Sequence, residues 1–421
     1  YTRWINDPDQ PWVTTSDERR FAALVLSAAG DVTWHALAPV AEVEKTIASL
    51  RELALTGARS GGRETGSKLG AQLSDLRRLL VDPLLGSLPE ATDRVVLSLA
   101  DELQLVPIED LPMADGRTFG ETLRVQIVPS LRTLLHEPSR PVAEPTALTL
   151  GSVDYDTMPE SGAPTFADAV TPIVATATYE GHRDAGDERA GENPTPKTFA
   201  DLFNTEARRV AKMFERAFPD ATPTVLREVD ASEAAFVAEA PGKTYLHLAT
   251  HGYFAPESAW RATDAPDGAS ALARFDAGAH DRVAQLSPFS LTGIALAGAN
   301  LPSDALGHRE GILTAQEIAQ LDLTSCYLAT LSACDTSLGV RRGGTGLASL
   351  RQAFHAAGAR FVLASLWRVN DVHAEELMAD FYTRLWKQHE DPAVALRGAK
   401  QAAKQRGVPF RDWAGWMISG T

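Results

Sequence analysis

The second half of the chain repeats one pattern, in which a short continuous run of apolar residues is followed by a segment with helical spacing. Continuous apolar runs are typical of parallel strands buried on both faces, and the intervening helices cover the sheet. The pattern therefore predicts an α/β fold of three layers with a mostly parallel sheet. The predicted strands lie at 147–151, 224–226, 244–249, 291–296, 326–331, 360–366 and 413–418, and the predicted helices at 205–218, 232–240, 314–320, 347–357, 372–387 and 393–405.

The first half mixes strands and helices less regularly. Two apolar runs that flank Gly30-Asp31 predict a hairpin. Prolines near residue 140 predict a boundary. We therefore expect an α/β amino-terminal half at 1–140, which is non-catalytic because it offers no reactive constellation, and a second half at 141–421. The other elements expected in the first half are helices at 40–55 and 70–84, a loop rich in Gly, Ser and Arg at 57–69, and strands at 94–100, 105–108 and 123–128.

Two long segments interrupt the regular second half. Residues 155–197 and 255–288 are polar and carry little periodicity, which predicts surface insertions. Activation loops, cleavage sites and partner surfaces all remain open as roles for them.

Two potentially reactive side chains follow predicted parallel strands. His251 comes after the strand at 244–249, and Cys334 comes after the strand at 326–331. Sites in such sheets form beyond the carboxyl ends of the strands, so both side chains fall where a site is expected. An imidazole within hydrogen-bond reach activates a thiol as a nucleophile, and acyl transfer also needs N–H donors for the oxyanion. The backbone N–H groups of Gly252 and Cys334 are the candidate donors.

Spacing alone leaves two interpretations of this pair open. Cys334 and His251 are either a nucleophile with its base, or a buried structural cysteine with a satisfied polar residue. Two nearby residues are expected to be structural. Cys326 lies inside a strand, where cysteine is usually a small buried hydrophobe, and His247 is predicted to be a packed or hydrogen-bonded strand residue.

Other chemistries have weaker support. Gly344-Thr345-Gly346 resembles the start of a dinucleotide fingerprint, but Ser349 stands where the third glycine belongs, which disfavours an oxidoreductase. His247 and His251 have part of the spacing of a zincin helix, but the glutamate is missing and the segment is a predicted strand. No Cys/His cluster has zinc spacing. We therefore expect no metal and no cofactor.

Composition narrows the partners. The 421 residues have a formal net charge of −15, so no basic surplus favours a nucleic acid or an anionic membrane as partner. Two cysteines exclude a disulfide framework and favour the cytoplasm. The apolar runs are too short to span a membrane, and no signal peptide is visible. Because the sequence begins at Tyr1, we expect it to be a fragment of a longer protein.

Several short motifs together resemble a known family. In chain order they are LHLATHG at 246–252, LSACDT at 331–336, GTGL at 344–347, AGA at 357–359, SLWRVND at 365–371 and WAGWMISG at 413–420. This series resembles the CHAT-family cysteine peptidases, the bacterial caspase-like group that is related to separase and often fused to tetratricopeptide repeats. The resemblance covers nearly the whole chain except the insertions at 155–197 and 255–288.

The resemblance implies a caspase-like fold and a role for each matching residue. It implies that His251 is the general base, that Cys334 is the nucleophile, and that the backbone of Gly252 and Cys334 binds the oxyanion. The family needs no third carboxylate, so Asp335 is expected to be a turn residue.

The resemblance also implies a substrate-binding edge. The segment that contains Trp367, Arg368 and Asp371 resembles the edge of the first specificity pocket in separase-like enzymes. Asp371 there would favour a basic residue before the scissile bond. Asp371 is equally suited to capping the following helix, and the positive charge of Arg368 works against the basic preference.

The expected function is a cysteine endopeptidase with a Cys–His dyad that cleaves a specific protein substrate. The resemblance further implies regulation by an upstream repeat domain or a partner protein. The alternative is a catalytically silent caspase-like module that only binds partners.

Overall fold

The structure is a computed structural model. It describes residues 2–6, 14–60, 63–135, 144–158, 199–254, 289, 292–301, 311–332, 339–342, 346–367 and 369–421. Cys334, Asp335, Arg368 and the insertion at 255–288 lie outside the described residues, as does all but the beginning of the insertion at 155–197. The chain divides into two compact units, Tyr1–Val128 and Pro129–Thr421.

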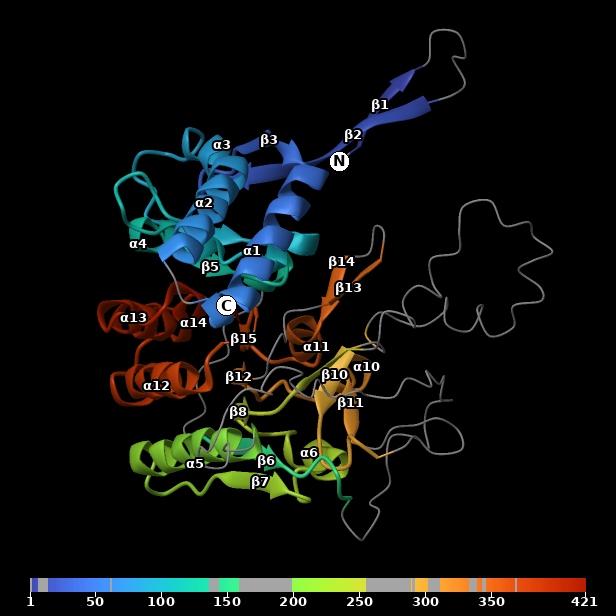
Figure 1. The fold of residues 1–421 in the computed structure, drawn as a ribbon, viewed down its shortest axis with the longest axis vertical. Coiled ribbons are helices and arrows are strands. Elements are labelled where there is room, and N and C mark those ends of the chain that lie inside the picture. The colour runs from blue at the N-terminus through green and yellow to red at the C-terminus, as the bar shows by residue number, and fades with distance from the viewer. Residues whose placement is uncertain are drawn as a thin grey trace, which may run out of the picture. The chain divides into compact units, whose positions relative to one another are not determined.

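The amino-terminal unit combines an antiparallel sheet, two long helices and a parallel strand pair (Figure 1). The expected hairpin is confirmed, because β2 and β3 pair antiparallel around Gly30, which has a φ of +93°. The elements of this unit are β1 (Thr2–Asn6), β2 (Thr14–Leu26), β3 (Val32–Pro39), α1 (Val40–Ser60), α2 (Arg63–Leu80), α3 (Asp82–Leu85), β4 (Arg94–Leu97), η1 (Asp101–Leu105), η2 (Ile108–Asp110), α4 (Phe119–Thr122) and β5 (Arg124–Ile127).

The expected loop at 57–69 is wrong. Residues 57–60 complete α1, and residues 63–69 begin α2. This segment contains Ala, Arg, Glu and Lys beside its glycines, and those four residue types have high helix propensity. The loop was predicted from the glycines and serines of this segment. The helices α1 and α2 instead extend into it, as its helix-forming residues favour.

The expected strand at 105–108 is also wrong, because this run joins the two 3₁₀ helices η1 and η2. Pro107 has no N–H to donate to a strand ladder. Its carbonyl instead accepts the N–H of Asp110 at 2.9 Å, which closes the turn of η2.

A six-stranded sheet organises the second unit. Its order is β16-β15-β12-β8-β6-β7, and all neighbours are parallel except β16, which pairs antiparallel with β15. The expected α/β class with a mostly parallel sheet is thus confirmed. The strands of this sheet are β6 (Ala147–Val153), β7 (Thr224–Glu228), β8 (Tyr245–Leu248), β12 (Leu328–Leu331), β15 (Phe361–Ser365) and β16 (Trp416–Gly420).

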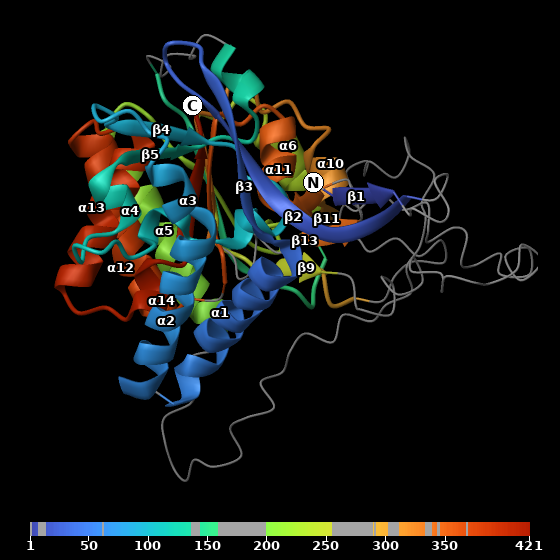
Figure 2. The same cartoon turned by 90° about the horizontal axis from the view of Figure 1, so that it is seen from above.

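Helices cover both faces of this sheet, as Figures 1 and 2 show. One face carries α5 (Phe199–Ala217), α12 (Asp371–Tyr382), the π-helix η6 (Thr383–Lys387) and α13 (Pro392–Gln405). The other face carries α6 (Glu233–Glu239), α10 (Ala315–Ile318) and α11 (Leu350–Ala356). Two short helices, η3 (Leu131–Leu135) and α14 (Phe410–Trp413), complete the helical elements described in this unit.

The side chains of β8 show why both faces are covered. Leu246 and Leu248 join the apolar core under α6, α10 and α11, where Phe354 is fully buried. Tyr245 points to the opposite face and packs edge-on against Trp386 of η6, with ring centroids 5.5 Å apart. Because successive side chains of a strand alternate between faces, a strand whose side chains are all buried requires both helical layers.

Smaller sheets flank this frame. The predicted strand at 291–296 belongs to an antiparallel sheet of order β11-β10-β9 instead of the parallel sheet. The helix expected at 347–357 begins only at Leu350, because β14 pairs with β13 before it. The strand expected at 413–418 begins at Trp416, after α14. The strands of the two smaller sheets are β9 (Gly252–Phe254), β10 (Thr292–Ala295), β11 (Ile312–Thr314), β13 (Gly339–Arg342) and β14 (Gly346–Ser349).

Candidate active site

The three candidate segments follow three neighbouring strands. His251 follows β8, Cys334 follows β12 and Trp367 follows β15, and β12 lies between the other two strands. In the parallel register Leu248 lies opposite Leu331. His251 and Cys334 each come three residues after this matched pair. Parallel neighbours lie about 4.8 Å apart, so the two segments leave the sheet at adjacent points of one edge.

Backbone hydrogen bonds fix the segment that carries His251. Ala249 N–H donates to Leu150 O at 2.8 Å, which ties the end of β8 to β6. His251 O accepts from Ala295 N–H at 2.9 Å, and Thr250 Oγ1 donates to Ala295 O at 2.5 Å. The half-buried His251 therefore sits at the junction where the chain passes from the parallel sheet to β9.

The imidazole of His251 lies against Tyr155. The two ring centroids are 5.3 Å apart, and the ring planes are inclined by 40°. The Tyr155 hydroxyl lies 3.0 Å from Thr250 Oγ1. Sequence reasoning missed both Tyr155 and Thr250. Tyr155 follows β6 closely, so the rule about carboxyl ends that located His251 applied to it as well.

The N–H of Gly252 points away from β10. The hydrogen bond between Ala295 and His251 makes these residues a hydrogen-bonded pair of the antiparallel ladder. The next pair, Ile294 and Gly252, is then of the non-hydrogen-bonded type, whose N–H groups face outward. Because β9 is an edge strand of its sheet, this N–H is directed toward the open edge.

The two cysteines differ in what the structure describes of them. Cys326 is buried, and burial raises the pKa of its thiol to about 12. It is a structural cysteine, as its place in the sequence predicted. Cys334 lies outside the described residues, and the chain after β12 is described as far as the buried Ser332.

The expected specificity edge is anchored from beneath. Trp367 is fully buried, and its Nε1–H donates to Arg411 O at 2.7 Å. Gly415 makes room for it, since a Cβ there would lie 2.9 Å from Trp367 Nε1 and 2.6 Å from Val369 Cγ1. Trp367 thus shapes the edge as a core residue. Arg368 lies outside the described part of the chain.

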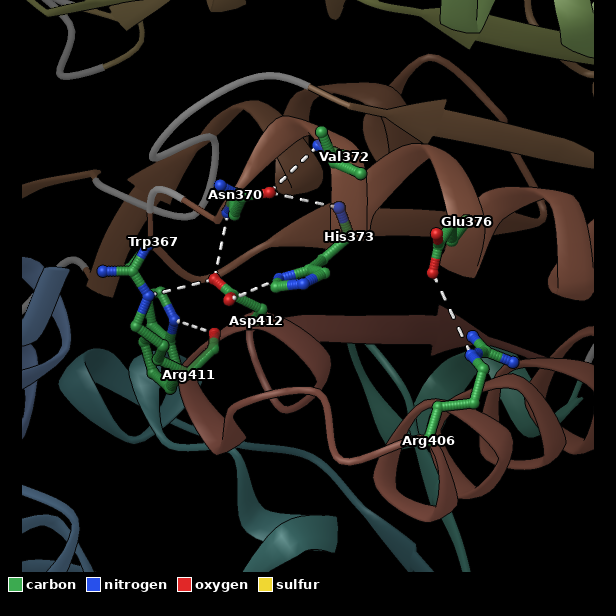
Figure 3. Close-up of polar contacts among 8 residues, drawn as sticks. All are labelled: Trp367, Asn370, Val372, His373, Glu376, Arg406, Arg411 and Asp412. Atoms are coloured by element: carbon green, nitrogen blue, oxygen red, sulfur yellow. Dashed lines mark hydrogen bonds and ion pairs between the residues drawn. The ribbon is translucent and has the colours of Figure 1, made fainter. Parts of the chain in front are cut away.

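The carboxylate of Asp412 gathers the polar groups of this edge (Figure 3). Its Oδ1 accepts from Asn370 N–H and from Arg411 Nε–H, both at 3.0 Å. Its Oδ2 lies 2.8 Å from His373 Nδ1. Asp412 is buried, and sequence reasoning missed it because α14 and the start of α12 are far apart in the chain.

The helix cap beside this edge is Asn370. Its Oδ1 accepts from the N–H groups of Val372 and His373, at 3.1 and 3.3 Å. Asp371 is the first residue of α12 and is half-buried, so it does not occupy the cap position.

A buried polar cluster crosses β8 and β12 beneath the site. The Tyr382 hydroxyl donates to Thr330 Oγ1 at 2.8 Å and lies 3.0 Å from His247 Nδ1. On the other side of the imidazole, His247 Nε2 lies 3.3 Å from Glu206 Oε1. Burial raises the pKa of Tyr382, which keeps its hydroxyl a neutral donor. The expectation that His247 is a hydrogen-bonded strand residue is confirmed.

Within the described ranges, no group of three or more His, Cys, Asp or Glu side chains is arranged to hold a metal ion. Among the same residues, no helix is both long enough and apolar enough to span a membrane.

The fold defines an α/β protein in which the candidate segments follow neighbouring strands at the carboxyl edge of a mostly parallel sheet. A family model described as the CHAT domain matches residues 70–421. The chain therefore belongs to the CHAT domain family, which confirms the family indicated by the motifs. Membership assigns it a cysteine-peptidase-type fold.

Solved structures give distant likenesses. Two crystal structures of the Saccharomyces cerevisiae separase–securin complex match at 13% and 12% identity, with TM-scores of 0.41 and 0.42. They cover 78% and 85% of this chain but only 15% and 18% of the separase chains. The Arg-specific cysteine proteinase gingipain R matches at 9% identity with a TM-score of 0.36, over 90% of this chain and 75% of its own. No curated protein sequence matches this chain.

Proposed function

We propose that this CHAT protein is a cysteine endopeptidase in which Cys334 is the nucleophile and His251 is the base. The observation that carries the proposal is the register of β8 and β12, in which the two residues follow the same matched pair by the same number of residues. Cys326, the other cysteine, is buried with a raised thiol pKa and is unsuited to attack a substrate.

The reaction proceeds through a thioester. His251 takes the thiol proton of Cys334, and the sulfur forms a bond to the carbonyl carbon of the scissile peptide. The outward N–H of Gly252, together with the N–H of Cys334, stabilises the oxyanion. The C–N bond then breaks, and the leaving amine takes the proton from His251. Water deprotonated by His251 attacks the thioester, which releases the acid and restores the thiol.

Substrate selection belongs to the edge after β15. The segment with Trp367, Arg368 and Asp371 follows the strand next to β12, so it borders the position of the nucleophile. A carboxylate at Asp371 favours a basic residue before the scissile bond. The substrate is a protein that is cut at few sites in the cytoplasm. An upstream repeat domain or a partner protein regulates the cleavage.

Labelling with peptide acyloxymethyl ketones tests the chemistry. We expect a probe that ends in Arg to label the wild type and Cys326→Ser equally, and to leave Cys334→Ala unlabelled. His251→Ala should label at least about 100-fold more slowly, the low end of a general base's contribution. A matched probe that ends in Leu tests the basic preference, and we expect it to react more slowly.

Proteome-wide mapping of new amino termini, with the wild type against Cys334→Ala, tests the endopeptidase activity. We expect cleavage sites that appear only with the wild type. Labelling that does not depend on Cys334, with no wild-type-specific cleavage, would instead identify a silent interaction module.

A further inference from the structure

Tyr155 stands at the switch point of the parallel sheet. From β6 the chain proceeds through α5 to β7 on one side, whereas β8 on the other side of β6 leads on to β12. In open α/β sheets, the crevice beyond the strand ends at such a reversal is where ligands bind. Tyr155 comes from the β6 side of this crevice and His251 from the β8 side, and their rings are in contact.

The position of Tyr155 is fixed by its own hydrogen bonds. Its backbone oxygen accepts from Asn300 N–H at 2.8 Å, and the preceding carbonyl of Asp154 accepts from Gly298 N–H at 3.1 Å. The hydroxyl meets Thr250 Oγ1, which itself donates to the backbone of β10. The ring is therefore held at both ends and presents a stationary surface to the imidazole.

We propose that Tyr155 is a positioning residue for His251, holding the imidazole in place at the end of β8 and stabilising its protonated form. This inference rests on the proposed function, in which the imidazole must accept the thiol proton. Aromatic rings attract cations to their faces, so the ring favours the imidazolium over the neutral base. The Tyr155 hydroxyl contacts Thr250 Oγ1, and Thr250 is the residue that precedes His251.

The loop that carries Tyr155 also carries Asp154 and Asp156, and both carboxylates are engaged locally. Asp154 Oδ1 accepts from Asp156 N–H at 3.0 Å, and Asp156 Oδ1 accepts from Asn300 Nδ2 at 2.9 Å. Strand β10, on the other side of His251, carries no charged residue. Among the described residues, the ring of Tyr155 is in contact with the imidazole of His251.

The proposal predicts a specific change in pH dependence. In a thiolate–imidazolium pair the acidic limb of reactivity reports thiolate formation, and the alkaline limb reports loss of the imidazolium proton. Removing the ring loosens the imidazole and weakens its ion pair with the thiolate, so the ion pair loses stability relative to both the doubly protonated and the doubly deprotonated forms. The acidic limb should then move up and the alkaline limb down, each by about half a pH unit.

Alkylation of Cys334 by iodoacetamide reports the acidic limb without requiring a substrate. The rate is measured from pH 4 to pH 10 in the Cys326→Ser background, with the alkaline limb taken from hydrolysis of a peptide ester. We expect Tyr155→Phe, which keeps the ring, to stay within about twofold of wild type at pH 6. Tyr155→Leu should react several-fold more slowly there and show the narrowed profile.

Val237→Ala is the matched control, because Val237 packs against the same apolar core as Tyr155 from α6. Its profile should equal that of the wild type. If Tyr155→Leu does not fold, Tyr155→Met replaces it, since Met keeps apolar volume without an aromatic face. A Tyr155→Leu or Tyr155→Met profile that matches wild type overturns the proposal.

His251→Ala separates this inference from the function beneath it. If His251→Ala changes the profile and the Tyr155 variants do not, the dyad stands and the positioning role fails. If His251→Ala itself leaves the profile unchanged, the dyad fails, and the positioning role fails with it.

Discussion

His355, in the last turn of α11, is a residue whose neutral form is built into the fold. Its Nδ1–H donates to Ala359 O at 3.0 Å, so its Nε2 accepts from the Ser419 hydroxyl at 2.7 Å. Burial lowers the pKa of this imidazole to about 4; the hydrogen bond to Ala359 opposes that shift, and the nearby charge of Arg351 adds to it.

This lowered pKa predicts a loss of stability in mild acid. An unfolded histidine titrates near pH 6.5, so the unfolded chain binds more protons than the folded chain between about pH 6.5 and pH 4. The stabilisation from His355 is therefore complete above pH 6.5 and is lost as the pH falls. Between pH 7 and pH 5 we expect the wild type to lose up to about 2 kcal/mol more than His355→Gln.

Urea unfolding at the two pH values measures this difference. The exposed His389 provides the control, and His389→Asn should keep the pH dependence of the wild type. Asn is chosen because His389 has a φ of +56°, which Asn tolerates. Equal losses in wild type and His355→Gln would show that His355 is not the titrating group.

Residue contacts of this kind were the least predictable part of the molecule. His251 was found from its sequence because it follows an apolar run directly. Tyr155 also follows a strand closely, but it was missed because its contact to Thr250 spans 95 positions, and the sequence does not show that β6 and β8 are neighbours. The pattern of a single segment identifies the strand end, whereas the residues that surround it are fixed by the order of strands in the sheet.

At the scale of elements, the connection between β15 and α12 depends on one buried carboxylate. Asp412 of α14 accepts from the backbone of Asn370 and from two side chains, His373 and Arg411 (Figure 3). Charge-assisted hydrogen bonds are stronger than neutral ones, and a buried group left partly satisfied costs about 1–3 kcal/mol. This connection is the edge to which we assign substrate selection.

We therefore expect Asp412→Asn to lower the free energy of unfolding by about 1–3 kcal/mol. Glu376→Gln is the matched control on α12, the helix whose start Asp412 contacts, since Glu376 lies 4.0 Å from Arg406 with both side chains exposed. An exposed pair contributes about 0–1 kcal/mol, so this variant should be near wild type. Urea midpoints compare the two, and equal effects would mean that Asp412 is not an anchor.

Elements with strong periodicity were predicted well, and short polar or mixed segments were not. The strands at β6, β8, β12 and β15 were found because continuous apolar runs have few other solutions. A helix was also expected at 314–320, and α10 begins there with a capping box in which Thr314 and Glu317 make both hydrogen bonds. By contrast, residues 347–349 were expected in a helix, and their pairing with β13 depends on a neighbour that local propensity does not reveal.

At the scale of the whole molecule, the order of the sheet places the ends of β8, β12 and β15 side by side. The sequence placed His251, Cys334 and Trp367 at strand ends, but their adjacency follows from the order β8-β12-β15. Any of several strand orders would satisfy the same apolar pattern. Because parallel strands run in the same direction, the sequence predicted that these residues lie at one edge of the sheet. Only the tertiary structure shows which strands are neighbours at that edge.

The division of the chain leads to a prediction about its units. All six strands of the large sheet, with the helices on both faces, lie within Pro129–Thr421. The family match, however, begins at residue 70, inside α2 of the other unit. If the sheet and its two helical layers suffice for folding, a fragment of residues 129–421 should unfold cooperatively in urea. Its Cys334 alkylation profile should equal that of the full chain.

The fragment with Cys334→Ala controls for labelling elsewhere, and circular dichroism checks its secondary structure. Failure of the fragment to fold would mean that the match beginning at residue 70 marks the true folding unit. A folded fragment with an altered pH profile would mean something different. The first unit would then influence the thiol without being needed for the sheet, which is the behaviour expected of a regulatory half.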